Sequence, residues 1–133
     1  MAYPSSTDIA LILEVNEYLL EDEFDFTGYI LVSYSIFDIE SKVQSWKEML
    51  IDVVKYLLKQ HTAKLLSLCS DPKFYDLSSQ KTQTTFTEIN SGVYLLTDCS
   101  TRTKISVLKR IFEACNVDQS QLSFVIKKYT VDD

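Results

Sequence analysis

Residues 86–126 constrain the fold more than any other part of the chain, because they contain consecutive signals for strand, turn, strand, helix and strand. The strands predicted at 84–89 and 93–98 flank Asn90-Ser91-Gly92, in which Asn and Gly supply the positive φ that a short hairpin loop requires. A strand at 122–127 closes the unit. This order of elements predicts an α+β fold.

The helix of this unit is predicted at 101–115. Ser100 or Thr101 caps its start, and Asn116 provides a left-handed stop, for which Asn is the second choice after Gly. Its outward side chains are Ser106, Lys109, Arg110 and Glu113, and its inward side chains are Ile105, Leu108, Ile111, Phe112 and Cys115.

A second amphipathic helix is predicted at 46–60. Ser45 and Glu48 fit a capping box, in which the hydroxyl accepts from the backbone three residues on and the carboxylate reaches back to the cap. The inward face consists of Trp46, Met49, Leu50, Val53, Leu57 and Leu58, and the outward face of Glu48, Asp52, Lys55 and Lys59. One or two further turns are expected at 63–68.

The N-terminal part has weaker signals. Residues 5–8 favour the cap of a helix at 9–20, although the apolar run could equally be a buried strand. A strand is predicted at 29–37, with Ile30, Val32, Tyr34 and Ile36 on one face. A turn at 38–41 and a short partner strand at 42–44 follow.

The whole chain of 133 residues is expected to form one domain. Its ends are predicted to fray near 1–5 and 130–133, and 76–84 to form a mobile loop. The expected architecture is a mainly antiparallel sheet packed against the two capped helices, with an N-terminal helix in addition.

Composition indicates a cytoplasmic protein. Hydrophobic residues make up 46% of the chain, yet no apolar run reaches the roughly 20 residues of a membrane span. Cys69, Cys99 and Cys115 form no close pair, which is typical of buried thiols in a reducing compartment.

The sequence lacks the residues that several common kinds of functional site require. Gly28 and Gly92 are the only glycines, so neither a P-loop nor a dinucleotide fingerprint is present. His61 is the sole histidine, and its position at a helix end favours a structural role. The acids of 21–25, and Asp98 beside Ser100, are interpreted as loop and cap residues. We therefore expect no enzyme activity, no metal and no cofactor.

Two charged surfaces are candidates for binding. The basic one comprises Arg102, Lys104, Lys109, Arg110, Lys127 and Lys128, and the acidic one Glu21, Asp22, Glu23 and Asp25. Solvated surface is the alternative interpretation of both. A net charge of −6 disfavours nonspecific nucleic-acid binding, since phosphate contacts depend on clustered Lys and Arg.

The chain also resembles a known family. The segments Val43-x-Ser45-Trp46-Lys47-Glu48-Met49-Leu50, Gly92-Val93-Tyr94-Leu95-x-Thr97-Asp98-x-Ser100 and Leu108-x-x-Ile111-Phe112-Glu113-Ala114-Cys115-Asn116-Val117-Asp118 carry the resemblance. They are similar to a small bacterial α+β domain of uncharacterised function, found at the C-terminus of larger proteins linked to restriction and phage defence. The resemblance covers about residues 42–126 and implies no catalytic residues. Asp98, Cys99 and Asn116 replace the usual Asn, Leu and Gly.

These observations predict a noncatalytic protein-interaction or regulatory module, in prokaryotic defence if the resemblance holds. The alternative is nucleic-acid binding through the basic C-terminal helix, and an enzyme of unknown class comes third. The two leading functions differ in one structural feature. Convergence of the six basic side chains would favour nucleic acid, and their dispersal would favour a protein partner.

Overall fold

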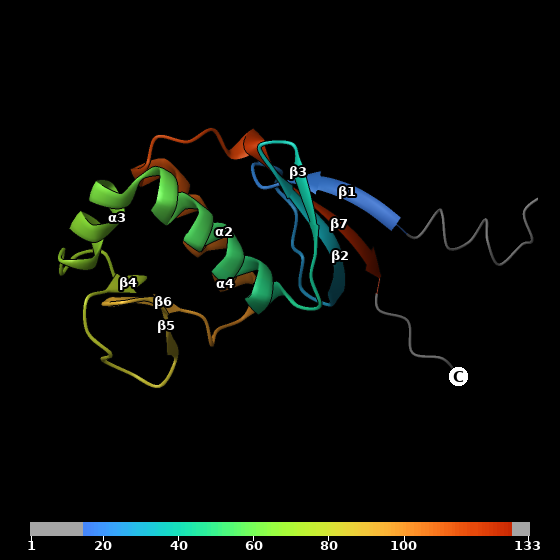
Figure 1. The fold of residues 1–133 in the computed structure, drawn as a ribbon. Helices are drawn as coiled ribbons and strands as arrows, with labels where there is room; N and C mark the ends of the chain where they lie inside the picture. Colours follow the sequence, from blue (N-terminus) through green and yellow to red (C-terminus); the bar gives the residue numbers. More distant parts are fainter. Residues whose placement is uncertain (1–14, 129–133) are drawn as a thin grey trace, which may run out of the picture.

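The computed structural model of the chain describes residues 15–128, and Figure 1 shows how its elements are arranged. In chain order the described elements are β1 (Val15–Leu19), β2 (Tyr29–Ile36), β3 (Ile39–Lys42), α2 (Trp46–Gln60), α3 (Thr62–Cys69), β4 (Leu77–Ser78), β5 (Phe86–Asn90), β6 (Val93–Leu96), α4 (Thr101–Ala114), the short 3-10 helix η1 (Gln119–Gln121) and β7 (Leu122–Lys128). Helices combined with antiparallel strands confirm the predicted α+β class.

The strands form two antiparallel sheets, so the prediction of one sheet is wrong. The first sheet has the order β1-β7-β2-β3 and the second the order β4-β6-β5. The helices α2 and α4 pack against each other, and α2 contacts both β2 and β5. Figure 1 shows the two sheets on different sides of this helix pair. Alternating hydrophobicity predicts which face of a strand is buried, but it leaves the partner strand open.

The helix α2 begins as predicted. The Ser45 hydroxyl accepts from the Glu48 backbone N–H at 3.1 Å, and the Glu48 carboxylate accepts from the Gln44 N–H at 3.2 Å, one residue before the predicted position. All six predicted inward side chains are buried. The Trp46 indole N–H also donates to the Tyr29 carbonyl at 2.9 Å, which ties the first turn of α2 to β2.

The helix α4 has both predicted end signals. The Ser100 hydroxyl accepts from the Thr103 N–H at 3.1 Å. Asn116 has a φ of 59°, and its N–H donates to the Glu113 carbonyl at 3.1 Å. The next N–H, of Val117, donates to the Phe112 carbonyl at 2.9 Å. This pair of hydrogen bonds is a Schellman motif, which satisfies carbonyls that the helix end would otherwise leave unpaired.

The predicted N-terminal helix is wrong where the structure describes it. Val15–Leu19 forms β1 and pairs with β7 in a register from Val15↔Lys127 to Leu19↔Ser123. The backbone of β7 offers a complete row of partners, and Tyr18 stacks on Phe24 with ring centroids 4.1 Å apart. Pairing and aromatic packing therefore favour the strand, the alternative that the sequence left open. Residues 9–14 lie outside the described range.

The strand β2 contains a bulge. Its register against β7 shifts between Leu31 and Ser33, which makes Val32 the extra residue. Leu31 and Tyr34 are buried, whereas Val32 is 36% exposed. The face predicted for this strand is therefore wrong at Val32, because an extra residue interrupts the alternation.

A two-residue turn, Phe37-Asp38, joins β2 to β3. Their φ angles are 48° and 66°, as the favoured two-residue hairpin turns require. The predicted turn at 38–41 and strand at 42–44 are wrong, since Ile39 already pairs with Ile36. The pair contains no Gly, so the turn carries only a weak sequence signal.

The hairpin of β5 and β6 confirms the two predicted strands and the role of Gly92, but the positive φ predicted at Asn90 is wrong, because Asn90 is the last residue of β5. Asn90 pairs with Val93, and Gly92 provides the positive φ of 73°. The prediction of a mobile loop at 76–84 is wrong at its first residues. Leu77–Ser78 forms β4 against β6, and Asp76 is 4% exposed. Because Asp76 has a charged side chain, its burial could not be predicted from the sequence.

Candidate interaction site

Three of the six predicted basic residues contact groups of the same chain, and two of the six, Arg102 and Lys109, line one hollow. Arg102 donates to Asp25 at 2.6 Å, and Arg110 donates to both carboxylate oxygens of Asp76 at 2.6 and 3.0 Å. Lys104 is only 9% exposed, and its ammonium group donates to the Cys99 carbonyl. The other three are Lys109 on α4 and Lys127 and Lys128 at the end of β7. Three of the six candidate basic residues therefore make contacts within the domain.

The predicted acidic patch is also partly occupied. The Asp22 carboxylate accepts from the Leu19 N–H at 2.8 Å, which closes the turn after β1. Asp25 binds Arg102 as described, so the two predicted surfaces contact each other. Hydrogen bonds from Thr27 and then from Arg102 lower the pKa of Asp25 to about 2. Glu21 and Glu23 remain exposed.

The basic and acidic segments also share a small hollow of about 370 Å³. Its lining comprises Glu23, Phe24, Asp25, Phe26, Arg102, Ile105, Ser106 and Lys109. The ion pair between Asp25 and Arg102 lies within this lining, so charge at the hollow is largely balanced. This balance makes it a weak site for a charged ligand.

The residues whose side chains could act in catalysis are buried or lie at structural contacts. His61 lies at the junction of α2 and α3, where its backbone N–H donates to the Leu57 carbonyl at 2.7 Å. Asp98 forms an ion pair with Lys47 at 2.7 Å. Burial raises the pKa values of the Cys69 and Cys115 thiols, which keeps both in the less nucleophilic protonated form. In residues 15–128 no group of three or more His, Cys, Asp or Glu side chains is placed to hold a metal.

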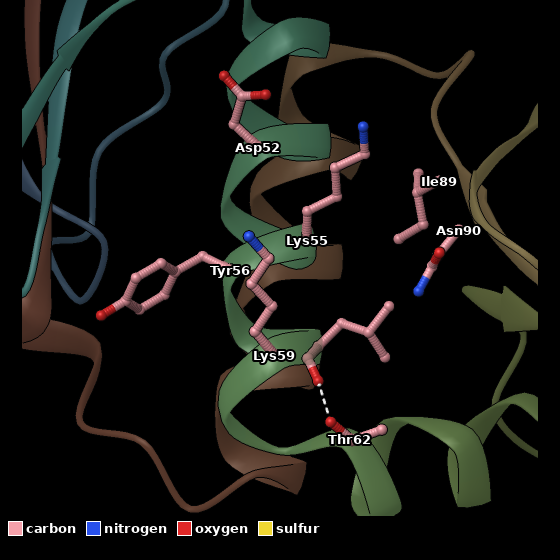
Figure 2. A pocket seen from close by; sticks show the side chains of 8 residues that line it. Asp52, Lys55, Tyr56, Lys59, Thr62, Ile89 and Asn90 are labelled. Carbon is pink, nitrogen blue, oxygen red and sulfur yellow. Dashed lines mark hydrogen bonds between the residues drawn. The ribbon is translucent and has the colours of Figure 1, made fainter.

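A larger hollow of about 600 Å³ lies over the solvent face of α2, and Figure 2 shows its side chains. We call it the α2 groove. It is lined by Asp52, Lys55, Tyr56, Leu58, Lys59, Thr62, Ile89 and Asn90.

Three elements build the α2 groove. The exposed side of α2 supplies most of the lining, the start of α3 supplies Thr62, and the end of β5 supplies Ile89 and Asn90. In Figure 2, Lys55 extends on the side of Ile89, whereas Tyr56 points to the opposite side of the helix. Tyr56 packs there against Phe37 of the β2–β3 turn, with ring centroids 5.7 Å apart. The groove is thus a shallow surface with rigid secondary structure beneath it.

Charge is ordered along the α2 groove. Asp52 lies toward the N-terminal end of α2, and its pKa is raised, first by burial and then by Glu48, while Lys55 opposes the shift. Lys55 and Lys59 lie toward the C-terminal end. Within residues 15–128 neither lysine forms an ion pair, unlike Lys47. The groove therefore presents two cations that form no ion pair in the described range, beside one acidic residue.

Neutral polar groups complete the lining. The Thr62 hydroxyl donates to the Leu58 carbonyl at 2.7 Å, which leaves its oxygen able to accept. The side-chain oxygen of Asn90 accepts from the Ser91 N–H at 3.0 Å, which leaves its amide nitrogen as a donor. The lining therefore offers hydrogen-bond donors and acceptors beside its charged side chains.

Sequence reasoning placed the charged residues of the α2 groove on an outward helix face but did not identify them as a site. The helical spacing of Glu48, Asp52, Lys55 and Lys59 was the available signal. The approach of Ile89 and Asn90, which lie 30 or more positions after the charged residues of α2, depends on how the second sheet docks on α2, and no local pattern records this.

Comparison with protein-family models, with curated proteins and with solved structures found no match to this chain. Among the helices of the described range, none combines the length and the apolar character that crossing a bilayer requires.

Proposed function

We propose that the domain is a noncatalytic protein-interaction module and that the α2 groove is its contact surface. The observation that carries this proposal is that three of the six basic residues make contacts within the chain. Arg102 and Arg110 are held by acids of the same chain, and Lys104 is buried. A nucleic-acid surface needs such cations free and close together.

The α2 groove supports a protein partner in two ways. Its lining mixes both charge signs with amide, hydroxyl and apolar groups, and this mixture is usual for the rim of a protein interface. Its backbone belongs to helices and a hairpin end, so binding orders side chains and not the backbone. The unpaired thiols support a reducing compartment, and the family resemblance supports a role beside larger defence proteins.

The proposal can be tested by filling the α2 groove. Tagged wild type and a Lys59→Trp variant are purified after crosslinking in the source cell, with and without nuclease treatment, and the bound proteins are quantified by mass spectrometry. Gln60→Trp is the matched control, because Gln60 is the exposed neighbour on the same helix and does not line the groove.

We expect Lys59→Trp to remove a protein that wild type and Gln60→Trp both retain. Equal recovery from all three would reject the groove as the contact surface. Recovery that disappears with nuclease alone would favour the nucleic-acid alternative.

A further inference from the structure

The two lysines of the α2 groove are the feature that identifies a partner. Lys55 and Lys59 are exposed and lie one helical turn apart, which is about 6 Å along the axis. Like every other described lysine except Lys47, they form no ion pair within residues 15–128, but these two line a single hollow of a chain whose net charge is −6. Cations left free in an acidic domain favour an anionic ligand.

The spacing of the lysines matches an extended peptide. In an extended chain, side chains at i and i+2 share one face and are separated by about 6.6 Å. Acidic residues at alternate positions would therefore meet Lys55 and Lys59 in turn.

The polar rim favours an extended ligand over a helical one. An extended segment leaves backbone N–H and C=O groups that need partners, whereas a helix satisfies its own. The Asn90 amide can donate to such a backbone, and the Thr62 hydroxyl oxygen can accept from it.

We infer that the α2 groove binds an extended acidic segment of a partner protein, with Glu or Asp at alternate positions over Lys55 and Lys59. This inference rests on the proposed function and adds the chemistry of the partner. The negative charge of Asp52 repels the acidic side chains of the bound segment, which keeps them at the end of the groove that holds the two lysines.

Fluorescence anisotropy at low ionic strength tests the inference with two labelled peptides. One alternates Glu and Thr, and the other has the same composition with all Glu residues adjacent. Each is titrated with wild type, with Lys55→Glu/Lys59→Glu, and with Lys64→Glu/Lys81→Glu as the control. The control makes the same change in net charge at exposed lysines that do not line the groove. Circular dichroism verifies the fold of each variant.

We expect the alternating peptide to bind wild type more tightly than the block peptide. Reversal of the groove lysines should weaken binding on the order of tenfold, and the control by about twofold at most. Equal losses in the two double variants would overturn the inference, as would equal binding of the two peptides. A single-stranded oligonucleotide that competes as well as the alternating peptide would also overturn it, since the groove would then bind any polyanion.

The outcome separates this inference from the proposed function. If neither peptide binds while Lys59→Trp still releases the native partner, the acidic segment is rejected and the interaction module stands. If Lys59→Trp releases nothing, the proposed function fails irrespective of the peptide result.

Discussion

Asp25 illustrates how single residues link distant parts of the chain. Its carboxylate accepts from the Thr27 N–H at 3.0 Å and from Arg102, which is 77 positions away in the sequence. The pair is exposed, so its effect on folding is modest and sensitive to salt. Its greater consequence is electrostatic, because it neutralises part of each surface that the sequence marked as charged.

The pH dependence of the Asp25 contact is a direct prediction. The pKa of Asp25 is about 2 in the folded chain, below its ordinary value of 3.8. The stabilisation is therefore complete above about pH 4 and is lost as the pH falls toward about 2. Arg102→Gln should raise the pKa of Asp25 part of the way, since the Thr27 hydrogen bonds remain.

NMR titration of the Asp25 carboxyl carbon measures this pKa. Lys109→Gln is the control, because Lys109 lines the same hollow without binding Asp25. An Asp25 pKa that is the same in wild type and Arg102→Gln would contradict the ion pair.

At the scale of elements, the ends of the helices are fixed by short-range hydrogen bonds. The last turn of α4 depends on Asn116, whose left-handed φ allows its own N–H and that of Val117 to reach carbonyls of the helix. Val117 then turns the chain toward η1 and β7. The strand β7 lies between β1 and β2 in the four-stranded sheet.

Substitutions at Asn116 test the stop. Asn116→Ala should lower the free energy of unfolding by about 1 kcal/mol, because a β-carbon is strained in the left-handed region and Ala lacks the local hydrogen bonding of Asn. Asn116→Gly should cause no loss. Urea denaturation measures both, with the exposed Asn16→Ala on β1 as a control. A loss for Gly equal to that for Ala would show that the side chain of Asn116, rather than its φ, matters.

At the scale of the whole molecule, the helix pair joins the two sheets. The buried apolar residues form one cluster that includes Leu95 of β6, Phe124 of β7 and the inward face of α2. Asp76, immediately before β4, adds a polar link through Arg110 of α4. The Asp76 side chain is 5% exposed and that of Arg110 is 49% exposed. The three-stranded sheet is thus held by apolar packing and by one partly buried ion pair.

Removal of Arg110 should therefore destabilise the whole domain. Arg110→Met leaves the Asp76 carboxylate buried without its partner, and we expect a loss of about 3 kcal/mol, at the low end for a broken buried pair because Arg110 is half exposed. Adding Asp76→Asn should recover part of the loss. Trp46 fluorescence and far-ultraviolet circular dichroism during urea denaturation should give coincident transitions.

Two results would contradict this picture. A change for Arg110→Met within about 0.5 kcal/mol would mean that the ion pair contributes no more than an ordinary surface contact. Separated transitions would mean that the two sheets unfold independently.

Local signals in the sequence were sufficient for the helices and the second hairpin. Ser45, Ser100 and Asn116 act through hydrogen bonds that span at most five residues, so their effect is readable without knowledge of the fold. Gly92 acts in the same way through its own φ. The class of the fold follows from these signals, because they fix the type and order of most elements.

The tertiary structure alone decided the sheets and the charged surfaces. Strand pairing, the bulge at Val32 and the burial of Asp76 depend on what packs against each strand. The ion pair of Arg110 with Asp76 joins residues 34 positions apart, and no short window of sequence contains both. The α2 groove has the same origin. Hydrogen bonds within a turn are encoded locally, whereas burial and charge pairing are properties of the complete packing arrangement.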